Sequence, residues 1–220
     1  MNGARTTLEL ADWRRRIADL YADVRRAAAT DPRAAWDRWR TAREALFREH
    51  PQSPVPLDRR RGFRAAHFDY DPRWRFEARL VADPGAADPH ADDGPAPAMP
   101  LALPVSAGGT MSFTRIGWVE LPSPVGSGRL AVYWLAGYAG GLFLPFRDGT
   151  NGSETYGAGR YLLDAAKAAD LGGEPQDGTL ILDFNFAYHP SCAFDPRWAC
   201  PLAPPENRLA FGVEAGERLS

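Results

Sequence analysis

Two stretches of the sequence hold most of the polar side chains that could do chemistry. The first runs from Phe143 to Leu163 and the second from Leu182 to Leu209, and both set charged and amide side chains among glycines and aromatics. Loops from different strands often converge in this way to form binding sites. We therefore expect a pocket lined by residues of both stretches, namely Arg147, Asp148, Thr150, Glu154, Tyr156, Arg160, Asp183, Asn185, Tyr188 and Asn207.

Arg160 is the leading candidate for anion binding in this set. It lies among glycines and tyrosines, and a guanidinium suits a planar carboxylate or phosphate. The structural alternative carries equal weight: Arg160 pairs with Asp148 or Asp183 and ties strands together, because buried charges are rarely left unpaired. In the functional interpretation Asp183 acts as a base or orienting group and Tyr156 supplies a hydrogen-bond donor, as hydrolysis or group transfer would need.

Alternation of side chains supports a pocket beside these residues. If residues 182–188 form a strand, Asp183 and Asn185 share one face and the opposite face is aromatic. When both faces are buried, the polar pair must be hydrogen-bonded or must line a cavity. In the first stretch, if residues 156–162 form a strand, Tyr156 and Arg160 share one face. Gly157 and Gly159 there permit close approach of another backbone segment.

The residues His189, Cys192 and Cys200 have a spacing that invites a metal-site interpretation. A structural zinc site needs four ligands, however, and the usual C-x-x-C pair is absent. A disulfide between Cys192 and Cys200 is sterically easy, and two reduced thiols are the alternative. We rank either thiol state above a metal and expect no cofactor. A Cys192–His189 nucleophilic dyad is conceivable, but Pro190 and the short separation disfavour its geometry.

Composition places the chain among ordinary globular proteins. Its 220 residues are 45% hydrophobic and 25% charged, which suits a single domain over residues 1–220. No apolar run approaches the ~18 residues of a membrane span or forms a signal-peptide core, so we expect a cytoplasmic protein without membrane contact. Residues 1–80 carry 18 Arg against 12 Asp plus Glu, but 25 Arg to 1 Lys fits a GC-rich genome better than nucleic-acid binding. Assembly with identical copies stays open.

The elements that must position the site follow from periodicity. Residues 1–50 show helical spacing, with a capping box at Thr6 and Glu9 and a second start at Asp31-Pro32. Residues 51–220 form a β-rich body with a flexible, low-complexity insertion at residues 83–100. Its expected strands cover residues 74–80, 101–105, 111–121, 129–136, 141–146, 179–184 and 209–214. We predict an α+β, mainly β fold, with an N-terminal helical hairpin packed on an antiparallel β-sandwich or partly open barrel.

The two stretches also resemble the domain-of-unknown-function 1684 (DUF1684) family of bacterial and archaeal proteins. The resemblance rests on F-R-D-G-T-N-G-S-E-T-Y-G-A-G-R-Y (Phe146–Tyr161), L-D-F-N-F-A-Y-H-P-S-C-A-F (Leu182–Phe194), C-P-L-A-P-P-E-N-R-L (Cys200–Leu209) and E-A-G-E (Glu214–Glu217). The resemblance implies a helical start, a β-rich body and no settled activity. The family pattern generally shows Asn where this chain has His189, which weakens a metal or dyad role for that histidine.

These observations lead to two functional hypotheses. The leading one is recognition of a small polar or anionic ligand in a β-rich pocket, with hydrolytic or transfer chemistry as an extension; whether the protein is an enzyme stays open. The alternative is a non-catalytic structural or interaction module whose polar residues hold loops together.

Overall fold

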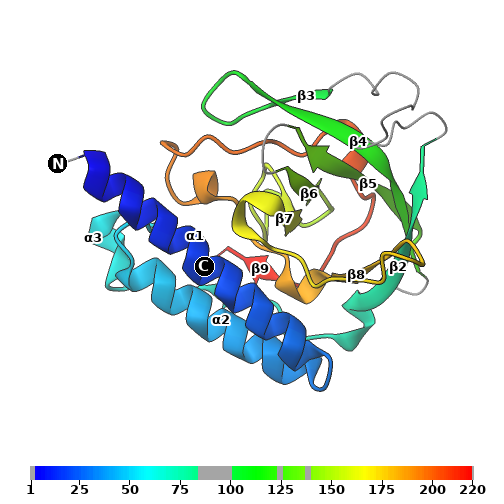
Figure 1. Ribbon diagram of the computed structural model, residues 1–220, viewed down its shortest axis with the longest axis horizontal. Helices are drawn as coiled ribbons and strands as arrows, with labels where there is room; N and C mark the ends of the chain where they lie inside the picture. Colours follow the sequence, from blue (N-terminus) through cyan, green and yellow to red (C-terminus); the bar gives the residue numbers. More distant parts are fainter. Residues whose placement is uncertain (1–2, 84–100, 123–125, 137–139, 220) are drawn as a thin grey trace.

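The chain folds into a helical hairpin followed by a β body, as the sequence predicts. The computed structural model describes residues 3–83, 101–122, 126–136 and 140–219. The β body is a strongly curled, antiparallel half-barrel, so the expected partly open barrel forms and the sandwich does not (Figure 1). The fold is α+β with more strand than helix. Apart from Asp83, the predicted insertion at 83–100 lies outside the described residues.

Three α-helices form among the described residues, namely α1 (Gly3–Ala28), α2 (Pro32–Glu49) and the short α3 (Leu57–Arg60). The predicted start of α2 is confirmed, because the Asp31 carboxylate accepts a hydrogen bond from the Ala34 amide at 2.9 Å. The predicted capping box at Thr6 is wrong. Here α1 already begins at Gly3, so Thr6 lies inside a helical turn and has no free amide to cap. Among the described residues, no helix combines the length and apolar character needed to cross a membrane.

In the part of the chain that the structure describes, seven strands make the half-barrel and two more form a small separate pair. The half-barrel contains β2 (Arg75–Ala82), β3 (Leu101–Pro104), β4 (Thr110–Leu121), β5 (Gly128–Leu135), β6 (Gly141–Phe146), β7 (Arg160–Asp164) and β8 (Thr179–Asp183). The separate pair is β1 (Ala66–His67) with β9 (Glu217–Arg218). Six strands follow the order β7-β6-β5-β4-β2-β8, and β3 pairs with β4. Every strand pair of the described residues is antiparallel.

Three strand predictions are corrected by the structure. The strand expected over 182–188 ends at Asp183, whose carboxylate accepts from the Asn185 amide at 3.0 Å and turns the chain into a 3-10 helix, η3 (Phe184–Phe186). The strand considered from Tyr156 begins only at Arg160, because Gly159 has a left-handed φ of 101°. Residues 209–214 form no strand; the amide of Leu209 instead donates to Arg147 O at 2.8 Å.

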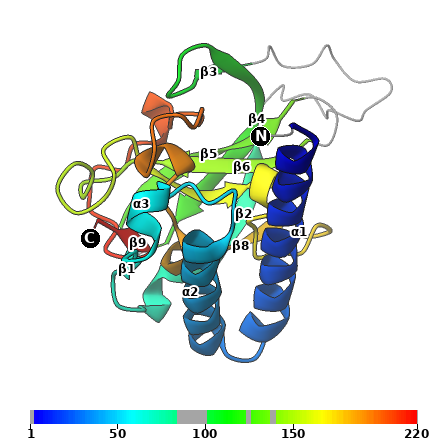
Figure 2. The same cartoon turned by 90° about the vertical axis from the view of Figure 1, so that its left-hand side faces the viewer.

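Each face of the sheet carries a buried core. One face carries aromatic residues such as Phe113, Tyr133 and Phe143, and packs against α1 and α2. Figure 2 shows these two helices side by side along one side of the β body. The opposite face carries aliphatic residues such as Leu130 and Val132, and packs against the segment that follows β8 and the C-terminal segment. The alternation within β5 therefore separates two cores, with the helices covering only the aromatic one.

Candidate functional site

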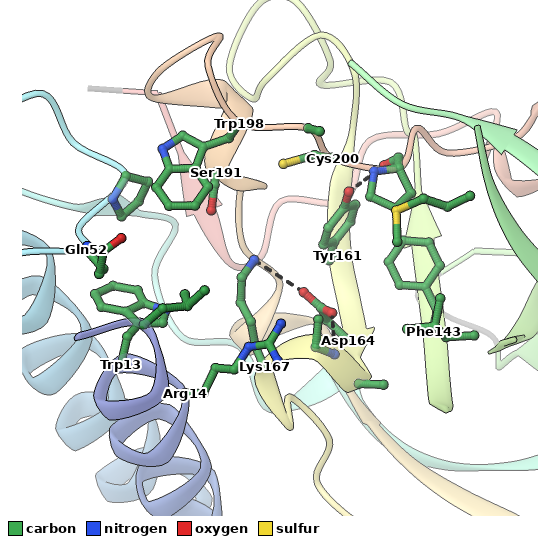
Figure 3. Close-up of a pocket in the computed structure, with 18 of the residues that line it drawn as sticks. Trp13, Arg14, Gln52, Phe143, Tyr161, Asp164, Lys167, Ser191, Trp198 and Cys200 are labelled. Atoms are coloured by element: carbon green, nitrogen blue, oxygen red, sulfur yellow. Dashed lines mark hydrogen bonds and ion pairs between the residues drawn. The ribbon is translucent and has the colours of Figure 1, made fainter. Parts of the chain in front are cut away.

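A cavity of about 270 Å³ lies between the N-terminal half of α1, strands β6 and β7, and the loop of residues 191–201 (Figure 3). We refer to it as the helix-sheet cavity. Five aromatic side chains of the described residues line it, namely Trp13, Phe113, Phe143, Tyr161 and Trp198. Polar groups at its edges come from Arg14, Gln52, Asp164, Lys167 and Ser191. A concave, mostly apolar site with a few polar groups is the usual form of a small-molecule site.

The aromatic wall is built by neighbouring strands that present the same face. Phe113 of β4 stacks on Phe143 of β6, with ring centroids 4.8 Å apart, and Phe143 meets the edge of Tyr161 of β7 at 4.9 Å. The Tyr161 hydroxyl donates to the carbonyl of Pro201, which holds the ring against the 191–201 loop. Burial raises the pKa of Tyr161 well above its ordinary value, so this ring remains neutral.

The polar end of the cavity is centred on Asp164 and Lys167. Lys167 Nζ lies 3.3 Å from Asp164 Oδ2, and the Tyr188 hydroxyl donates to the same oxygen at 2.7 Å. The ammonium also lies 4.8 Å from the Tyr188 ring centroid and 5.6 Å from that of Tyr161. Arg14 adds a second positive charge at the edge. Among the described lining residues, two cations and one carboxylate give this end of the cavity a net positive charge.

A short turn after β7 places these two charges. Asp164 is the last residue of β7, and its carboxylate accepts from the Ala166 amide at 3.0 Å, which begins the 3-10 helix η2 (Ala165–Lys167). Ala168 then takes a left-handed φ of 49°, and the chain returns so that Ala169 exchanges two backbone hydrogen bonds with Asp164. The turn therefore positions Lys167 to reach back to Asp164 from three residues away.

The residues predicted around Arg160 form a buried network of hydrogen bonds. Arg160 Nη2 donates to Asp148 Oδ2 at 2.9 Å and to Val213 O at 2.8 Å, while Nη1 donates to Ala215 O. Asp148 also accepts from the Thr150 hydroxyl at 2.6 Å. The side chains of Arg160 and Asp148 are both 0% exposed. This is the pairing that the structural interpretation of Arg160 expects.

Asp183 and Asn185 lie at a different place, where β2 meets β8. Asp183 is buried, and Arg75 Nη1 lies 3.4 Å from its Oδ2 atom. Burial raises the pKa of Asp183, and its contacts with Asn185 and Arg75 oppose that effect. The Asn185 side chain accepts from the Asp71 amide at 3.0 Å and donates to the Asp71 carbonyl at 2.9 Å. The Asn185 amide is thus hydrogen-bonded within the protein, one of the two outcomes that the sequence leaves open.

The other five predicted residues are engaged by different neighbours. Their contacts are Arg147 Nη2 to Gly157 O (2.9 Å), the Glu154 carbonyl to the Leu219 amide (2.8 Å), the Tyr156 hydroxyl to Cys192 Sγ (3.9 Å), the Tyr188 hydroxyl to Asp164 Oδ2 (2.7 Å) and Asn207 Nδ2 to Pro145 O (2.7 Å). Of these five residues, Tyr188 contacts a residue that lines the helix-sheet cavity, namely Asp164 at its polar end. None of the ten predicted residues lines this cavity itself, and their role in ligand binding stays a prediction.

The two cysteines lie together as free thiols beside the cavity. The Cys192 amide donates to Cys200 Sγ at 3.3 Å, and Cys200 lines the cavity. His189 does not serve as a base for Cys192, because its Nε2 atom accepts from the Tyr156 amide at 3.2 Å. No group of three or more His, Cys, Asp or Glu side chains with a metal-binding arrangement exists in the described part of the chain.

A second buried charge cluster joins α2 to the C-terminal strand β9. Arg43 Nη2 lies 2.9 Å from Glu217 Oε2, and the His189 amide donates to the same oxygen at 2.6 Å. Burial opposes ionisation of Glu217, but the charge and hydrogen bond of Arg43, together with His189 and His67, outweigh it and lower the pKa of Glu217 to about 2. Burial lowers the pKa of His189 to about 4, against the attraction of Glu217. This cluster fastens the helical hairpin to the β body.

The sequence interpretation missed the charged residues of the cavity. Phe143 and Tyr161 lie in the first polar stretch but carry no catalytic signature, and Asp164 and Lys167 lie just beyond it. One feature of the sequence could have pointed to Lys167, because it is the single lysine beside 25 arginines. Trp13 lies within residues 1–50, where the sequence shows only helical spacing. Its exposure to a cavity depends on where α1 packs.

Comparisons with known proteins agree with this fold. The profile of the family described as "Protein of unknown function (DUF1684)" matches residues 63–218. The chain is also similar to the solution NMR structure of an uncharacterized protein from Haloarcula marismortui, with 31% sequence identity and a TM-score of 0.55. That similarity covers 82% of this chain and 90% of the archaeal one. The search of curated proteins gave no match. On the family match and the structural similarity together, the chain belongs to the DUF1684 family.

Proposed function

We propose that this protein binds a small carboxylate with an apolar body in the helix-sheet cavity. The observation that carries the proposal is the position of Lys167, whose ammonium lies at one end of a cavity with five aromatic side chains in its wall. An apolar body would pack against Phe143 and Trp13, and a carboxylate would face the ammonium. The proposal keeps the small anionic ligand expected from the sequence but assigns it to other residues.

The size of the cavity limits the ligand. At about 270 Å³ it lies just below the range of roughly 300–1,000 Å³ that holds drug-sized molecules. A single aromatic ring or a short aliphatic chain with one carboxylate suits this volume. Larger cofactors such as dinucleotides do not.

Charge favours an anion over a cation at the polar end. Within the described residues Lys167 makes one ion pair, with Asp164, and an ammonium has three donors. Its side chain is 20% exposed, so donors remain for a ligand. Tyr188 already donates to Asp164 Oδ2, which leaves that carboxylate less able to attract a competing cation.

Binding, rather than hydrolysis or transfer, is what the geometry of this cavity supports. Among the described cavity residues, no serine or cysteine is hydrogen-bonded to a histidine or carboxylate that could take its proton. Hydrolytic or transfer activity would need such a nucleophile–base pair or an equivalent.

The single lysine allows a direct test. Reductive methylation with labelled formaldehyde keeps the charge and places one NMR reporter on Lys167 beside that of the N-terminus. We expect short aromatic and aliphatic carboxylates, such as phenylacetate and hexanoate, to shift the Lys167 signal and raise the melting temperature of the protein. Lys167→Met should weaken binding by about tenfold or more, because a charge-assisted hydrogen bond is lost.

Two controls make this test decisive. Arg79→Met removes an exposed cation from β2 outside the cavity and should leave the affinity unchanged. The neutral amides of the same acids should bind less well than the acids. Equal affinity of the Lys167→Met variant and the unmodified protein, or of acids and amides, would refute the proposal.

The structural module remains the second candidate function, and one observation favours it. Every side chain in the network of Arg160, Asp148 and Thr150 is buried and paired within the protein. If the protein is such a module, variants of these residues should lower the melting temperature, and no small carboxylate should raise it.

A further inference from the structure

The two cysteines lie in a setting suited to thiol chemistry. Cys200 Sγ accepts the Cys192 amide at 3.3 Å, and the Tyr156 hydroxyl lies 3.9 Å from Cys192 Sγ. Ser106 holds the backbone on either side of Ala199. Its hydroxyl accepts from the Cys200 amide at 3.0 Å and donates to Trp198 O at 2.8 Å. Two thiols are therefore held together by ordered donors, unlike a lone buried cysteine.

The local electrostatics separate the roles of the two sulfur atoms. A hydrogen bond from the Cys200 side chain lowers the pKa of Cys192 to about 6, burial opposes this, and the Tyr156 hydroxyl adds to the lowering. The same hydrogen bond and burial raise the pKa of Cys200. Cys192 is thus the thiolate near neutral pH, and Cys200 holds its proton.

Access to the pair is narrow. Cys192 and Cys200 are each 7% exposed, and Cys200 lines the helix-sheet cavity. Figure 3 shows Cys200 at the edge of the cavity between Trp198 and Tyr161. A small oxidant that enters the cavity meets Cys200, whose Sγ atom lies 3.3 Å from the Cys192 amide, whereas a protein disulfide cannot enter a cavity of about 270 Å³.

We propose that Cys192 and Cys200 form a redox-active dithiol that reduces a small hydroperoxide and closes to a disulfide. The Cys192 thiolate attacks the terminal oxygen of the hydroperoxide, the O–O bond breaks, and an alcohol leaves after taking up a proton. This gives a sulfenic acid on Cys192. The Cys200 thiol then attacks the Cys192 sulfur, loses its proton, and releases water. Two thiols and one hydroperoxide thus give one disulfide, one alcohol and one water.

The disulfide would also change the wall of the cavity. It would close the segment between residues 192 and 200, which contains Trp198 and follows the cavity residue Ser191. Oxidation would remove the Cys200 thiol as a hydrogen-bond donor to Cys192. The redox reaction needs no carboxylate ligand, so its test is independent of ligand binding in the cavity.

A peptide-mapping experiment tests the proposal on the native protein. One equivalent of hydrogen peroxide should remove two hydrogen masses from the intact chain. Arg197 lies between the cysteines, so trypsin separates the peptide containing Cys192 from the one containing Cys200. After oxidation these peptides should stay joined until a reductant is added. Joining that occurs only in urea, or oxidation without joining, would overturn the proposal.

Single variants identify the attacking sulfur. In Cys200→Ser, oxidation should stop at a sulfenic acid on Cys192 that dimedone traps. In Cys192→Ser, Cys200 should remain a thiol under the same conditions. Trapping of Cys200 in Cys192→Ser as fast as trapping of Cys192 in Cys200→Ser would contradict the assignment.

Tyr156 acts in this scheme as a positioning residue, and its role has a separate signature. Tyr156→Phe should slow oxidation severalfold at neutral pH and move the midpoint of the rate profile to higher pH. Tyr70→Phe, at a half-buried tyrosine outside the cavity, should leave both unchanged. An unshifted profile in Tyr156→Phe would remove Tyr156 from the mechanism.

Discussion

Arg160 Nη2 lies 2.9 Å from Asp148 Oδ2, and neither side chain is exposed to solvent. Arg160 belongs to β7, Asp148 to the loop that follows β6, and the carbonyl groups bound by Arg160 come from the C-terminal segment. Burial lowers the pKa of Arg160 while Asp148 opposes that effect. The ion pair and the backbone hydrogen bonds of Arg160 therefore fasten three segments of the chain.

Asp148→Asn should lower the free energy of unfolding by about 3–5 kcal/mol, because it leaves the Arg160 charge buried without its counter-ion. Urea unfolding monitored by tryptophan fluorescence measures this change. Asp37→Asn is the matched control, since Asp37 pairs with Arg33 on the surface of α2 and should contribute little. Equal effects of the two substitutions would show that the buried pair does not fasten the fold.

Gly159→Ala should destabilise the protein by more than about 1 kcal/mol. Gly159 has a left-handed φ of 101°, and an added Cβ would meet the carbonyl oxygen of Phe146 inside van der Waals distance. Gly157→Ala provides the comparison, because the nearest atom to its added Cβ is 4.0 Å away. Thermal unfolding of the two variants should separate them, and a Gly157→Ala variant as unstable as Gly159→Ala would contradict this account.

Asn207→Ala should cost about 2–4 kcal/mol of unfolding free energy, since it strips buried backbone groups of their partners. The Asn207 side chain accepts from the Ala131 amide at 2.8 Å and donates to Ala131 O at 2.9 Å and to Pro145 O at 2.7 Å. It therefore joins β5 to β6 beside the irregular step at Pro145. Chemical denaturation gives the value, and Gln176→Ala, which removes an exposed amide, should have almost no effect.

Acid should destabilise the fold in a window set by His189. Its pKa is about 4 in the folded protein and 6.5 ordinarily, so between these values the unfolded chain binds a proton that the folded protein does not. The stability that neutral His189 contributes to the fold is complete above pH 6.5 and is lost as the pH falls to about 4. We expect His189 alone to account for about 3 kcal/mol of this loss.

His189→Asn tests this assignment, because asparagine does not titrate. Unfolding free energies at several pH values should show a shallower slope from pH 6.5 to 4 in the variant. Some slope should remain from His67, whose pKa burial also lowers to about 4. Below pH 4.5 a second loss should follow from Glu217, whose pKa of about 2 lies below its ordinary value. An unchanged slope in His189→Asn would assign the acid sensitivity to other groups.

Local features of this fold were predictable because neighbouring residues encode them. The cap at Asp31 and the strand over residues 141–146 formed as their spacing indicates. The close backbone approach at Gly159 was also foreseen, whereas Gly157 needs none. Prediction failed where a side chain redirected the backbone. The Asp183 carboxylate captures an amide two residues ahead and ends a strand whose alternation continues in the sequence.

The sequence by itself determined the helical hairpin, most strands, the family and the choice of partners open to Arg160. Only the tertiary structure decided that Asp148 is the partner, and that the cavity belongs to Trp13, Phe143 and Lys167. The physical reason is how far apart in the sequence the interacting residues lie. Periodicity, caps and backbone angles depend on residues a few positions apart, whereas facing a cavity or another segment depends on how distant elements pack. Trp13 and Lys167 are far apart in sequence and line one cavity because α1 packs beside the end of β7.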